Sequence, residues 1–257
     1  MTTYLDRILE AHRADAALDR RDLGALAAAA SACPPTRGFA GAIAGSDGMA
    51  VIAEVKRRTP SKGPLVAHLD PSALASAYAA GGASCLSVLT DARFFDGSPD
   101  DLAMARRRVD LPVLRKDFTV GPADVCDARL MGADAVLLIA AALSPTELHD
   151  CADMAADVGI EVLVEVHDEA EAAAAVASGA ALIGVNQRDL VTFEVDTARA
   201  ERVAKVLPDD VVRVAESGIR GPDDAARLAD AGFAAVLVGD SLVTAADPAA
   251  AVAALRR

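Results

Sequence analysis

The chain has 257 residues and a formal net charge of −13, from 38 acidic and 25 basic side chains. This length suits one large domain, and the negative charge argues against nucleic acid or an anionic membrane surface as a partner. No apolar run approaches the length of a membrane span, and Asp6, Arg7 and Glu10 stand where a signal peptide would be apolar, so we expect a cytoplasmic protein.

The first 48 residues predict a helical extension that precedes the first strand. Apolar residues at helical spacing indicate a helix from 2 to about 20, and the alanine-rich stretch 23–32 indicates a second. The stretch 38–48 has the composition of a loop. Because this extension is too short to bury a core of its own, we expect residues 1–48 to pack on the rest of a single domain that comprises residues 1–257.

From Val51 onward, short aliphatic runs alternate with longer alanine-rich windows. The predicted strands lie near 51–55, 85–89, 112–115, 135–139, 160–166, 181–185, 211–215 and 235–238. Helix start signals follow at Asp70-Pro71, Ser98-Pro99, Gly121-Pro122, Ser144-Pro145, Asp168, Asp196, Gly221-Pro222 and Asp247-Pro248. Eight alternating strand–helix units predict an α/β fold, a (β/α)8 TIM barrel, and leave a three-layer open sheet as the alternative.

A repeated glycine supports this arrangement. Gly82, Gly132, Gly179 and Gly232 each end a predicted helix shortly before an even-numbered strand, and they recur roughly every fifty residues. A glycine that ends a helix in the left-handed conformation lets the chain turn back toward the sheet. The repeat therefore indicates two strand–helix units per period.

Polar side chains gather at the predicted strand ends, which is where active sites of this fold lie. They are Glu54, Lys56, Lys116, Glu165, Asn186, Arg188 and Glu216. Three cations from separate strands in an acidic protein indicate a local positive potential for an anionic ligand.

The last two strand ends indicate that this anion is a phosphate. Ser217-Gly218 and Gly239-Asp240-Ser241 follow strands seven and eight, where barrels bind phosphate through backbone N–H groups and a short helix. Glycine at positions 218 and 239 allows close approach of the backbone. We expect Asp240 to face away from the anion and to cap its own helix.

Aromatic residues suggest a second part of the ligand site. Phe94, Phe95 and Phe118 lie just past strands two and three and could form an apolar wall for a ring. We expect the other three, Phe39, Phe193 and Phe233, to be core residues. His167 stands beside Asp168 at a helix start and is predicted to be a surface residue.

No metal site or cofactor is predicted. The four cysteines have no C-x-x-C spacing, and metalloprotease, P-loop and dinucleotide motifs are absent from the sequence. The expected partner is a small phosphorylated molecule, and no obligate protein partner is evident.

Seven segments together resemble the indole-3-glycerol phosphate synthase family of tryptophan biosynthesis. They are 52–57 (IAEVKR), 59–63 (TPSKG), 86–91 (LSVLTD), 94–98 (FFDGS), 111–118 (LPVLRKDF), 184–190 (GVNQRDL) and 214–218 (VAESG). The stretch 4–9 also resembles the extra N-terminal helix of that family. The resemblance implies that 1-(2-carboxyphenylamino)-1-deoxyribulose 5-phosphate is closed to an indole with loss of CO₂ and water.

The resemblance also implies roles for individual residues. Lys116 and Glu165 match the principal acid and base, and Glu54, Lys56 and Asn186 assist them. The implied substrate contacts are Arg188, Phe95, Phe118, Ser61, Leu190 and Glu216. The implied phosphate contacts are Lys56, Ser217, Gly218, Gly239 and Asp240.

Two other functions stay open on the residues alone. A barrel lysine could form a Schiff base, as in a class I aldolase that acts on a sugar phosphate. Alternatively, the chain could be a barrel that binds a phosphorylated ligand without catalysis. Glutamates beside Lys56 and Lys116 would keep both lysines protonated, which favours acid catalysis over a Schiff base.

Overall fold

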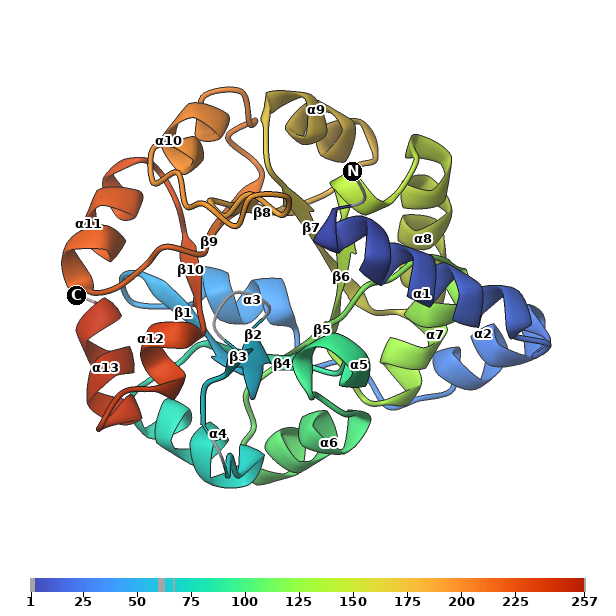
Figure 1. Cartoon of the computed structure of the whole chain (residues 1–257), viewed down its shortest axis with the longest axis horizontal. Coiled ribbons are helices and arrows are strands. Elements are labelled where there is room, and N and C mark those ends of the chain that lie inside the picture. The colour runs from blue at the N-terminus through green and yellow to red at the C-terminus, as the bar shows by residue number, and fades with distance from the viewer. Residues whose placement is uncertain (1–2, 60–62, 67, 257) are drawn as a thin grey trace.

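The computed structural model describes residues 3–59, 63–66 and 68–256, and within these ranges eight parallel strands close into a barrel (Figure 1). The order around the barrel is β1-β10-β9-β8-β7-β6-β5-β4. The strands are β1 (Ala50–Val55), β4 (Cys85–Leu89), β5 (Val113–Lys116), β6 (Ala135–Ile139), β7 (Glu161–Val166), β8 (Leu182–Asn186), β9 (Val212–Glu216) and β10 (Ala235–Val238). The predicted TIM barrel is therefore confirmed, and the open sheet is excluded.

Three strands continue one residue beyond their predicted ends, to Lys116, Asn186 and Glu216. Each of these residues stays in register with a neighbouring strand, because Lys116 pairs with Leu89 and Asn186 pairs with Glu216. Backbone pairing thus carries functional side chains to the rim of the barrel while their Cα positions remain fixed by the sheet.

Helices follow the strands and surround the barrel. They are α4 (Pro71–Ala80), α5 (Ala92–Phe95), α6 (Pro99–Arg108), α7 (Pro122–Leu130), α8 (Pro145–Val158), α9 (Glu169–Ala177), α10 (Arg199–Ala204), α11 (Pro222–Asp230), α12 (Asp240–Val243) and α13 (Pro248–Leu255), with a 3-10 turn, η1 (Ala140–Ala142). The start signal predicted at Asp196 was wrong. Its side chain accepts a hydrogen bond from Ala198 N in a turn, and α10 begins only at Arg199.

The repeated glycines end helices as predicted. Gly132 has φ of 87°, and its N–H donates to the carbonyl of Arg129 while Ala133 N–H donates to that of Ala128. These two bonds satisfy carbonyl groups at the end of α7 and turn the chain into β6.

Three helices precede the barrel: α1 (Tyr4–Leu18), α2 (Leu23–Ser31) and α3 (Phe39–Ala44). The prediction of a loop over 38–48 was wrong, because α3 forms there. Its first amides, of Phe39 and Ala40, donate to the Glu161 carboxylate at 2.5 and 2.8 Å. Such a cap comes from a residue more than a hundred positions away, so the local sequence does not reveal it.

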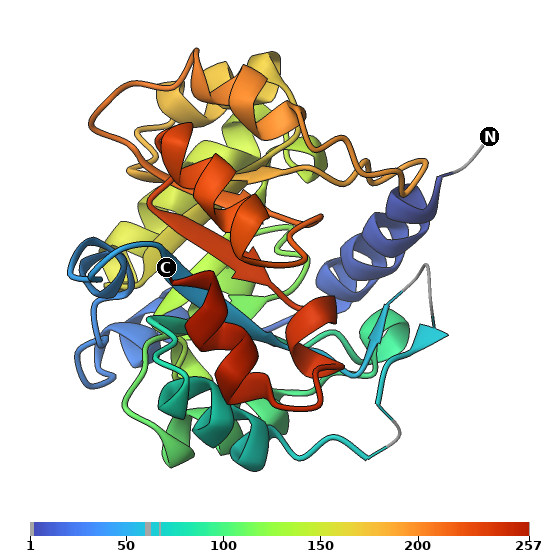
Figure 2. The same ribbon diagram turned by 90° about the vertical axis from the view of Figure 1, so that its left-hand side faces the viewer.

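The N-terminal helices lie at different ends of the barrel. Phe39 and Ile43 of α3 are buried against residues at the beginnings of strands, including Ala50 and Cys85. Figure 2 shows α1 on the same side of the barrel as the short antiparallel hairpin of β2 (Arg58–Thr59) and β3 (Gly63–Pro64). That side holds the C-terminal ends of the barrel strands.

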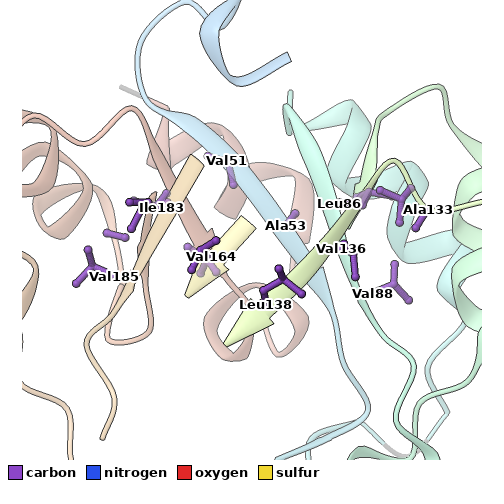
Figure 3. Packing of buried hydrophobic residues seen from close by; sticks show 14 of the residues in the cluster. Val51, Ala53, Leu86, Val88, Ala133, Val136, Leu138, Val164, Ile183 and Val185 are labelled. Atoms are coloured by element: carbon purple, nitrogen blue, oxygen red, sulfur yellow. The ribbon is translucent and has the colours of Figure 1, made fainter. Parts of the chain in front are cut away.

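The core has two layers because side chains alternate along each strand. Val51 and Ala53 belong to the layer between strands and helices, together with Leu86, Val136 and other residues shown in Figure 3. Ile52, between them in the sequence, belongs to the layer inside the barrel. In the described part of the chain, no helix is both long and apolar enough to cross a membrane.

Candidate active site

A cavity of about 600 Å³ opens at the C-terminal ends of the strands. Its lining includes every predicted site residue except Phe94, which lies outside the cavity, and Ser61, which lies outside the described residues. These lining residues are Glu54, Lys56, Phe95, Lys116, Phe118, Glu165, Asn186, Arg188, Leu190, Glu216, Ser217, Gly218, Gly239 and Asp240.

Lys116 forms the centre of one network in this cavity. Its Nζ lies 2.7 Å from Glu165 Oε2 and 2.6 Å from Glu216 Oε2, so that β5, β7 and β9 each contribute one side chain. Asn186 of β8 donates from Nδ2 to Glu165 Oε1 at 3.0 Å. The four groups are therefore held together by four different strands.

Space for Glu216 depends on a glycine in the neighbouring strand. A Cβ built on Gly184 of β8 would lie 2.2 Å from Glu216 Oε1 and 3.3 Å from Leu163 Cδ1. Any larger residue at position 184 would displace the carboxylate that contacts Lys116.

Lys56 forms a second network at the other side of the mouth. Its Nζ lies 2.5 Å from Glu54 Oε1 and 3.0 Å from Asp240 Oδ1. The expectation that Asp240 faces away was therefore wrong. Asp240 is the first residue of α12, after the N-cap residue Gly239, and its side chain lines the cavity beside the ammonium of Lys56.

Gly239 makes room for this second network. A Cβ at that position would lie 2.3 Å from Glu54 Oε1 and 2.9 Å from Lys56 Nζ. The glycine thus accommodates the Glu54–Lys56 pair, a role that the sequence did not indicate.

Both lysines are held in the ammonium form. Burial alone would lower the pKa of Lys116, but the carboxylates of Glu165, Glu216 and Glu54 outweigh it and raise that pKa above its ordinary value. Likewise, burial opposes the charge on Lys56, while Glu54 and Asp240 raise its pKa. A lysine in such surroundings is a proton donor rather than a nucleophile.

The two carboxylates at Lys116 differ in their affinity for a proton. Burial would raise the pKa of Glu165, but Lys116, His167 and Asn186 hold it below its ordinary value. For Glu216, burial and the neighbouring Glu165 charge prevail over Lys116 and raise the pKa to about 7. Two carboxylates with separated proton affinities are suited to different roles in acid–base chemistry.

The loop after β9 adopts an unusual backbone conformation. Ser217 and Gly218 have φ of 64° and 74°, both in the left-handed region, which is sparsely populated for a residue such as serine. Gln187, fully buried after β8, donates from Nε2 to the Ser217 carbonyl at 2.7 Å. Sequence reasoning missed Gln187, because a polar run at a strand end does not reveal which member turns inward.

Aromatic rings form one wall of the cavity. The rings of Phe95 and Phe118 lie 6.0 Å apart, and both line the cavity. Phe94 packs on Tyr4 of α1 at 5.9 Å and is not part of the lining. Phe193 was wrongly predicted as core: it lines the cavity and packs edge-on against Tyr4 at 5.5 Å.

Arg188 and Leu190 reach the cavity from the segment after β8. Arg188 donates from its backbone N–H to Asn186 Oδ1 at 3.0 Å and from Nη1 to the Phe193 carbonyl at 3.1 Å. These two bonds fix both ends of the arginine beside the mouth.

The other two phenylalanines predicted as core residues, Phe39 and Phe233, are buried, so that prediction is confirmed for both.

His12 connects α1 to the strand ends. Its Nε2 lies 2.9 Å from Asp91 Oδ2 and 3.9 Å from Asp117 Oδ1, and its ring is 5.6 Å from that of Phe118. The three polar groups are close enough to face a single ion. However, Asp117 already accepts hydrogen bonds from Thr90 and from Arg115, whose guanidinium neutralises it. A contact that holds α1 on the barrel therefore explains this cluster better than a metal site does.

The prediction that His167 is a surface residue was wrong. Its side chain is 11% exposed, with Nδ1 3.0 Å from Glu171 Oε2 and Nε2 3.4 Å from Glu165 Oε1. The start of α9 places Glu171 four residues later, where its carboxylate draws the ring inward. The side chain thus lies directly behind Glu165.

Comparisons with known proteins point to one enzyme family. A family model described as indole-3-glycerol phosphate synthase matches residues 5–255. An indole-3-glycerol phosphate synthase of Rhodococcus opacus (strain B4) is 50% identical over 253 residues, covering 98% of this chain and 94% of that protein. Indole-3-glycerol phosphate synthase 1 of Streptomyces coelicolor is 50% identical over 252 residues, covering 97% and 93%.

Solved structures with low sequence identity share the fold alone. An N-acetylmannosamine-6-phosphate 2-epimerase from Clostridium perfringens gives a TM-score of 0.60 at 16% identity, covering 75% of this chain and 86% of that one. A thiamine phosphate pyrophosphorylase from Pyrococcus furiosus gives 0.59 at 17% identity, covering 81% and 94%. Because the family match spans nearly the whole chain, the resemblance inferred from the sequence is confirmed, and the chain belongs to the indole-3-glycerol phosphate synthase family.

Proposed function

We propose that this chain closes 1-(2-carboxyphenylamino)-1-deoxyribulose 5-phosphate to indole-3-glycerol phosphate, with release of CO₂ and water. The observation that carries the proposal is the Lys116 ammonium, held at 2.7 and 2.6 Å between Glu165 and Glu216 inside a cavity that also presents an aromatic wall. This arrangement supports a mechanism in which a proton donor and a base act on one ligand.

The cavity offers separate surroundings for the two ends of the substrate. The aromatic ring packs against Phe95, Phe118 and Leu190, which form the apolar side. The phosphate binds the backbone at Ser217-Gly218 and Gly239-Asp240, with the Lys56 ammonium adding positive charge. Binding both ends brings the reacting carbons together, which lowers the entropic part of the barrier.

Ring closure needs a donor to the substrate's carbonyl oxygen. As the ring carbon that bears the carboxylate attacks the carbonyl carbon, negative charge develops on that oxygen, and Lys116 Nζ donates a proton to it. The bond to the carboxylate then breaks, CO₂ leaves, and its electron pair restores the aromatic ring. Lys116 is well suited to this step because its neighbours keep it protonated.

Dehydration needs a second donor and a base. The new hydroxyl leaves as water after a cavity lysine donates a proton to it, and solvent then reprotonates that lysine. A carboxylate removes a proton from the carbon next to nitrogen to form the indole double bond. We assign this base to Glu165, which Asn186 orients through its 3.0 Å hydrogen bond. Lys56 and Glu54, 2.5 Å apart, assist at the phosphate side of the mouth.

The environment of the lysines favours this reaction over an aldolase mechanism. A Schiff base forms from a neutral amine, and both cavity lysines have a raised pKa. Borohydride added during turnover should therefore leave activity and protein mass unchanged. A mass increase on Lys56 or Lys116 would instead support the Schiff-base alternative.

A direct assay tests the function itself. Purified protein mixed with the carboxyphenylamino deoxyribulose phosphate should produce indole absorbance and fluorescence with release of CO₂. Lys205→Ala removes an exposed lysine that does not line the cavity, and it serves as a control that should retain full activity. If the wild-type protein bound the substrate without forming indole, the chain would be a binding protein rather than a lyase.

The proposal extends to setting and partners. A phosphorylated metabolite as substrate supports a cytoplasmic location. The net charge of −13 supports a protein that acts without nucleic acid or an anionic membrane surface. An obligate protein partner is not part of the proposal.

A further inference from the structure

Glu165 and Glu216 share Lys116, yet their other surroundings differ. Glu165 Oε1 accepts a hydrogen bond from Asn186 and lies 3.4 Å from His167 Nε2. Among the described residues, none donates a hydrogen bond to the buried Glu216 Oε1. Because Lys116 contacts both carboxylates at nearly equal distances, the asymmetry between them comes from Asn186 and His167.

The ring of His167 carries a positive charge beside Glu165. Its Nδ1 lies 3.0 Å from Glu171 Oε2 and its Nε2 lies 3.4 Å from Glu165 Oε1, so a carboxylate oxygen faces each ring nitrogen. An ionised carboxylate only accepts hydrogen bonds, so this position favours a proton on both nitrogens. The backbone N–H of His167 donates to the same oxygen at 2.7 Å and fixes the carboxylate. Burial opposes a charged ring, but Glu165 and Glu171 prevail and raise the pKa of His167 to about 10.

We propose that His167 is a positioning residue whose imidazolium keeps Glu165 ionised, so that a proton taken up by the carboxylate pair resides on Glu216. The inference rests on the proposed function, in which Glu165 removes a proton from the substrate and must be ionised to do so. His167 is absent from the cavity lining, so it acts through Glu165 and not on the substrate.

The other charges around the pair do not supply this asymmetry. Lys116 contacts both carboxylates, and the charge of Glu54 on β1 acts on Lys116. Glu171 of α9 is negative and contacts His167 rather than Lys116. Among the described residues, His167 is therefore the cation that distinguishes Glu165 from Glu216.

The sign of the effect follows from these charges. Removing the imidazolium removes positive charge beside the carboxylates, so the pair binds its proton more tightly and the acid limb of kcat/KM moves to higher pH. Removing the Glu171 charge leaves the imidazolium acting on Glu165 alone. The acid limb of kcat/KM should therefore not move to higher pH. A merely structural role of the His167–Glu171 contact would shift both variants alike.

The test compares three glutamine variants across pH. In the wild type, the acid limb should lie below pH 7, because the first proton that the pair takes up resides on Glu216, whose pKa is about 7, and leaves the base Glu165 ionised. In His167→Gln, this limb should move up by about one pH unit, and kcat should change by a larger factor than KM. Glu171→Gln should show no upward shift. His149→Gln is the matched control, because His149 pairs with Asp153 at the same i,i+4 spacing, 3.5 Å apart, but is 65% exposed on α8. Equal upward shifts in His167→Gln and Glu171→Gln, or no shift in either, would overturn the proposal.

A second readout does not depend on activity. The ¹⁵N NMR signals of the His167 ring, identified by their loss in His167→Gln or in His167→Asn, should show both nitrogens protonated at pH 8 in the wild type. A neutral ring at that pH would contradict the proposal even if a variant failed to fold. If the wild type did not convert the substrate, the proposed function would fail while the charge of the ring was still measured.

Discussion

Lys56 and Asp240 lie at opposite ends of the barrel sequence and meet across the cavity mouth, with Nζ 3.0 Å from Oδ1. β1 and β10 are neighbours in the closed sheet, which brings the two residues together. The contact places an anion beside the proposed phosphate site and partly neutralises the lysine that would attract the phosphate.

Replacing this anion should strengthen phosphate binding. In Asp240→Asn, the Lys56 charge is shared with one carboxylate fewer, so inorganic phosphate should inhibit about fivefold more tightly. The inhibition constant of phosphate measures the effect. Asp210→Asn, which changes an exposed aspartate, serves as the control with the same change in net charge. A weaker inhibition in Asp240→Asn would show that Asp240 positions Lys56 rather than competing for it.

Loss of the proton donor should abolish turnover but leave binding. Lys116→Met keeps the aliphatic stem and removes the ammonium, so kcat should fall by about 10²- to 10⁴-fold. Substrate affinity, measured by calorimetry, should change much less. An unchanged kcat would remove Lys116 from the proposed mechanism.

Glu165→Gln should lower kcat more than it raises KM. The amide keeps the size of the side chain and loses the base, so substrate still fits the cavity while proton removal is impaired. Steady-state kinetics at saturating substrate measure the effect. A change confined to KM would reassign Glu165 to substrate positioning.

Gln187 should matter only for the phosphate. Gln187→Met is similar in length but leaves the Ser217 carbonyl without its donor, so the left-handed loop loses a buried hydrogen bond. We expect about tenfold weaker inhibition by inorganic phosphate. Turnover of the dephosphorylated substrate should be equal in variant and wild type. An equal loss of turnover with the phosphorylated and the dephosphorylated substrate would indicate general damage to the fold.

Docking of α1 should depend on pH through His12. Burial opposes the charge on His12, but Asp91 and Asp117 prevail and raise its pKa in the folded state. Its contribution to docking is therefore complete below the ordinary histidine pKa of about 6.5 and is lost as pH rises through the raised value. At low pH, protonation of Asp91, whose pKa is lowered by His12, removes the same contact.

Hydrogen exchange measures this docking. Amides of α1, corrected for the intrinsic pH dependence of exchange, should be protected more at pH 6 than at pH 9. His12→Asn should lose that difference, whereas His149→Asn, at an exposed histidine, should keep it. Equal protection of wild-type α1 at both pH values would contradict the role of His12.

The repeating part of this protein could be predicted from local sequence patterns. Strand and helix periodicity, glycines such as Gly132 and start signals such as Ser144 report local backbone preferences, and these depend on nearby residues alone. The closed barrel then places all strand ends at one mouth, so Lys116 and Glu165 could be assigned to one site before their contact was known.

Which polar groups meet could not be predicted in the same way, because these contacts form between distant segments of the folded chain. Glu161 caps α3, Asp240 turns toward Lys56, and His167 lies behind Glu165, because each side chain responds to charges that other strands bring near. Such pairings join residues far apart in sequence or on opposite sides of a turn, and no local pattern encodes their distances. The different pKa values of Glu165 and Glu216 depend on these contacts and on burial, which exist only after the barrel has closed.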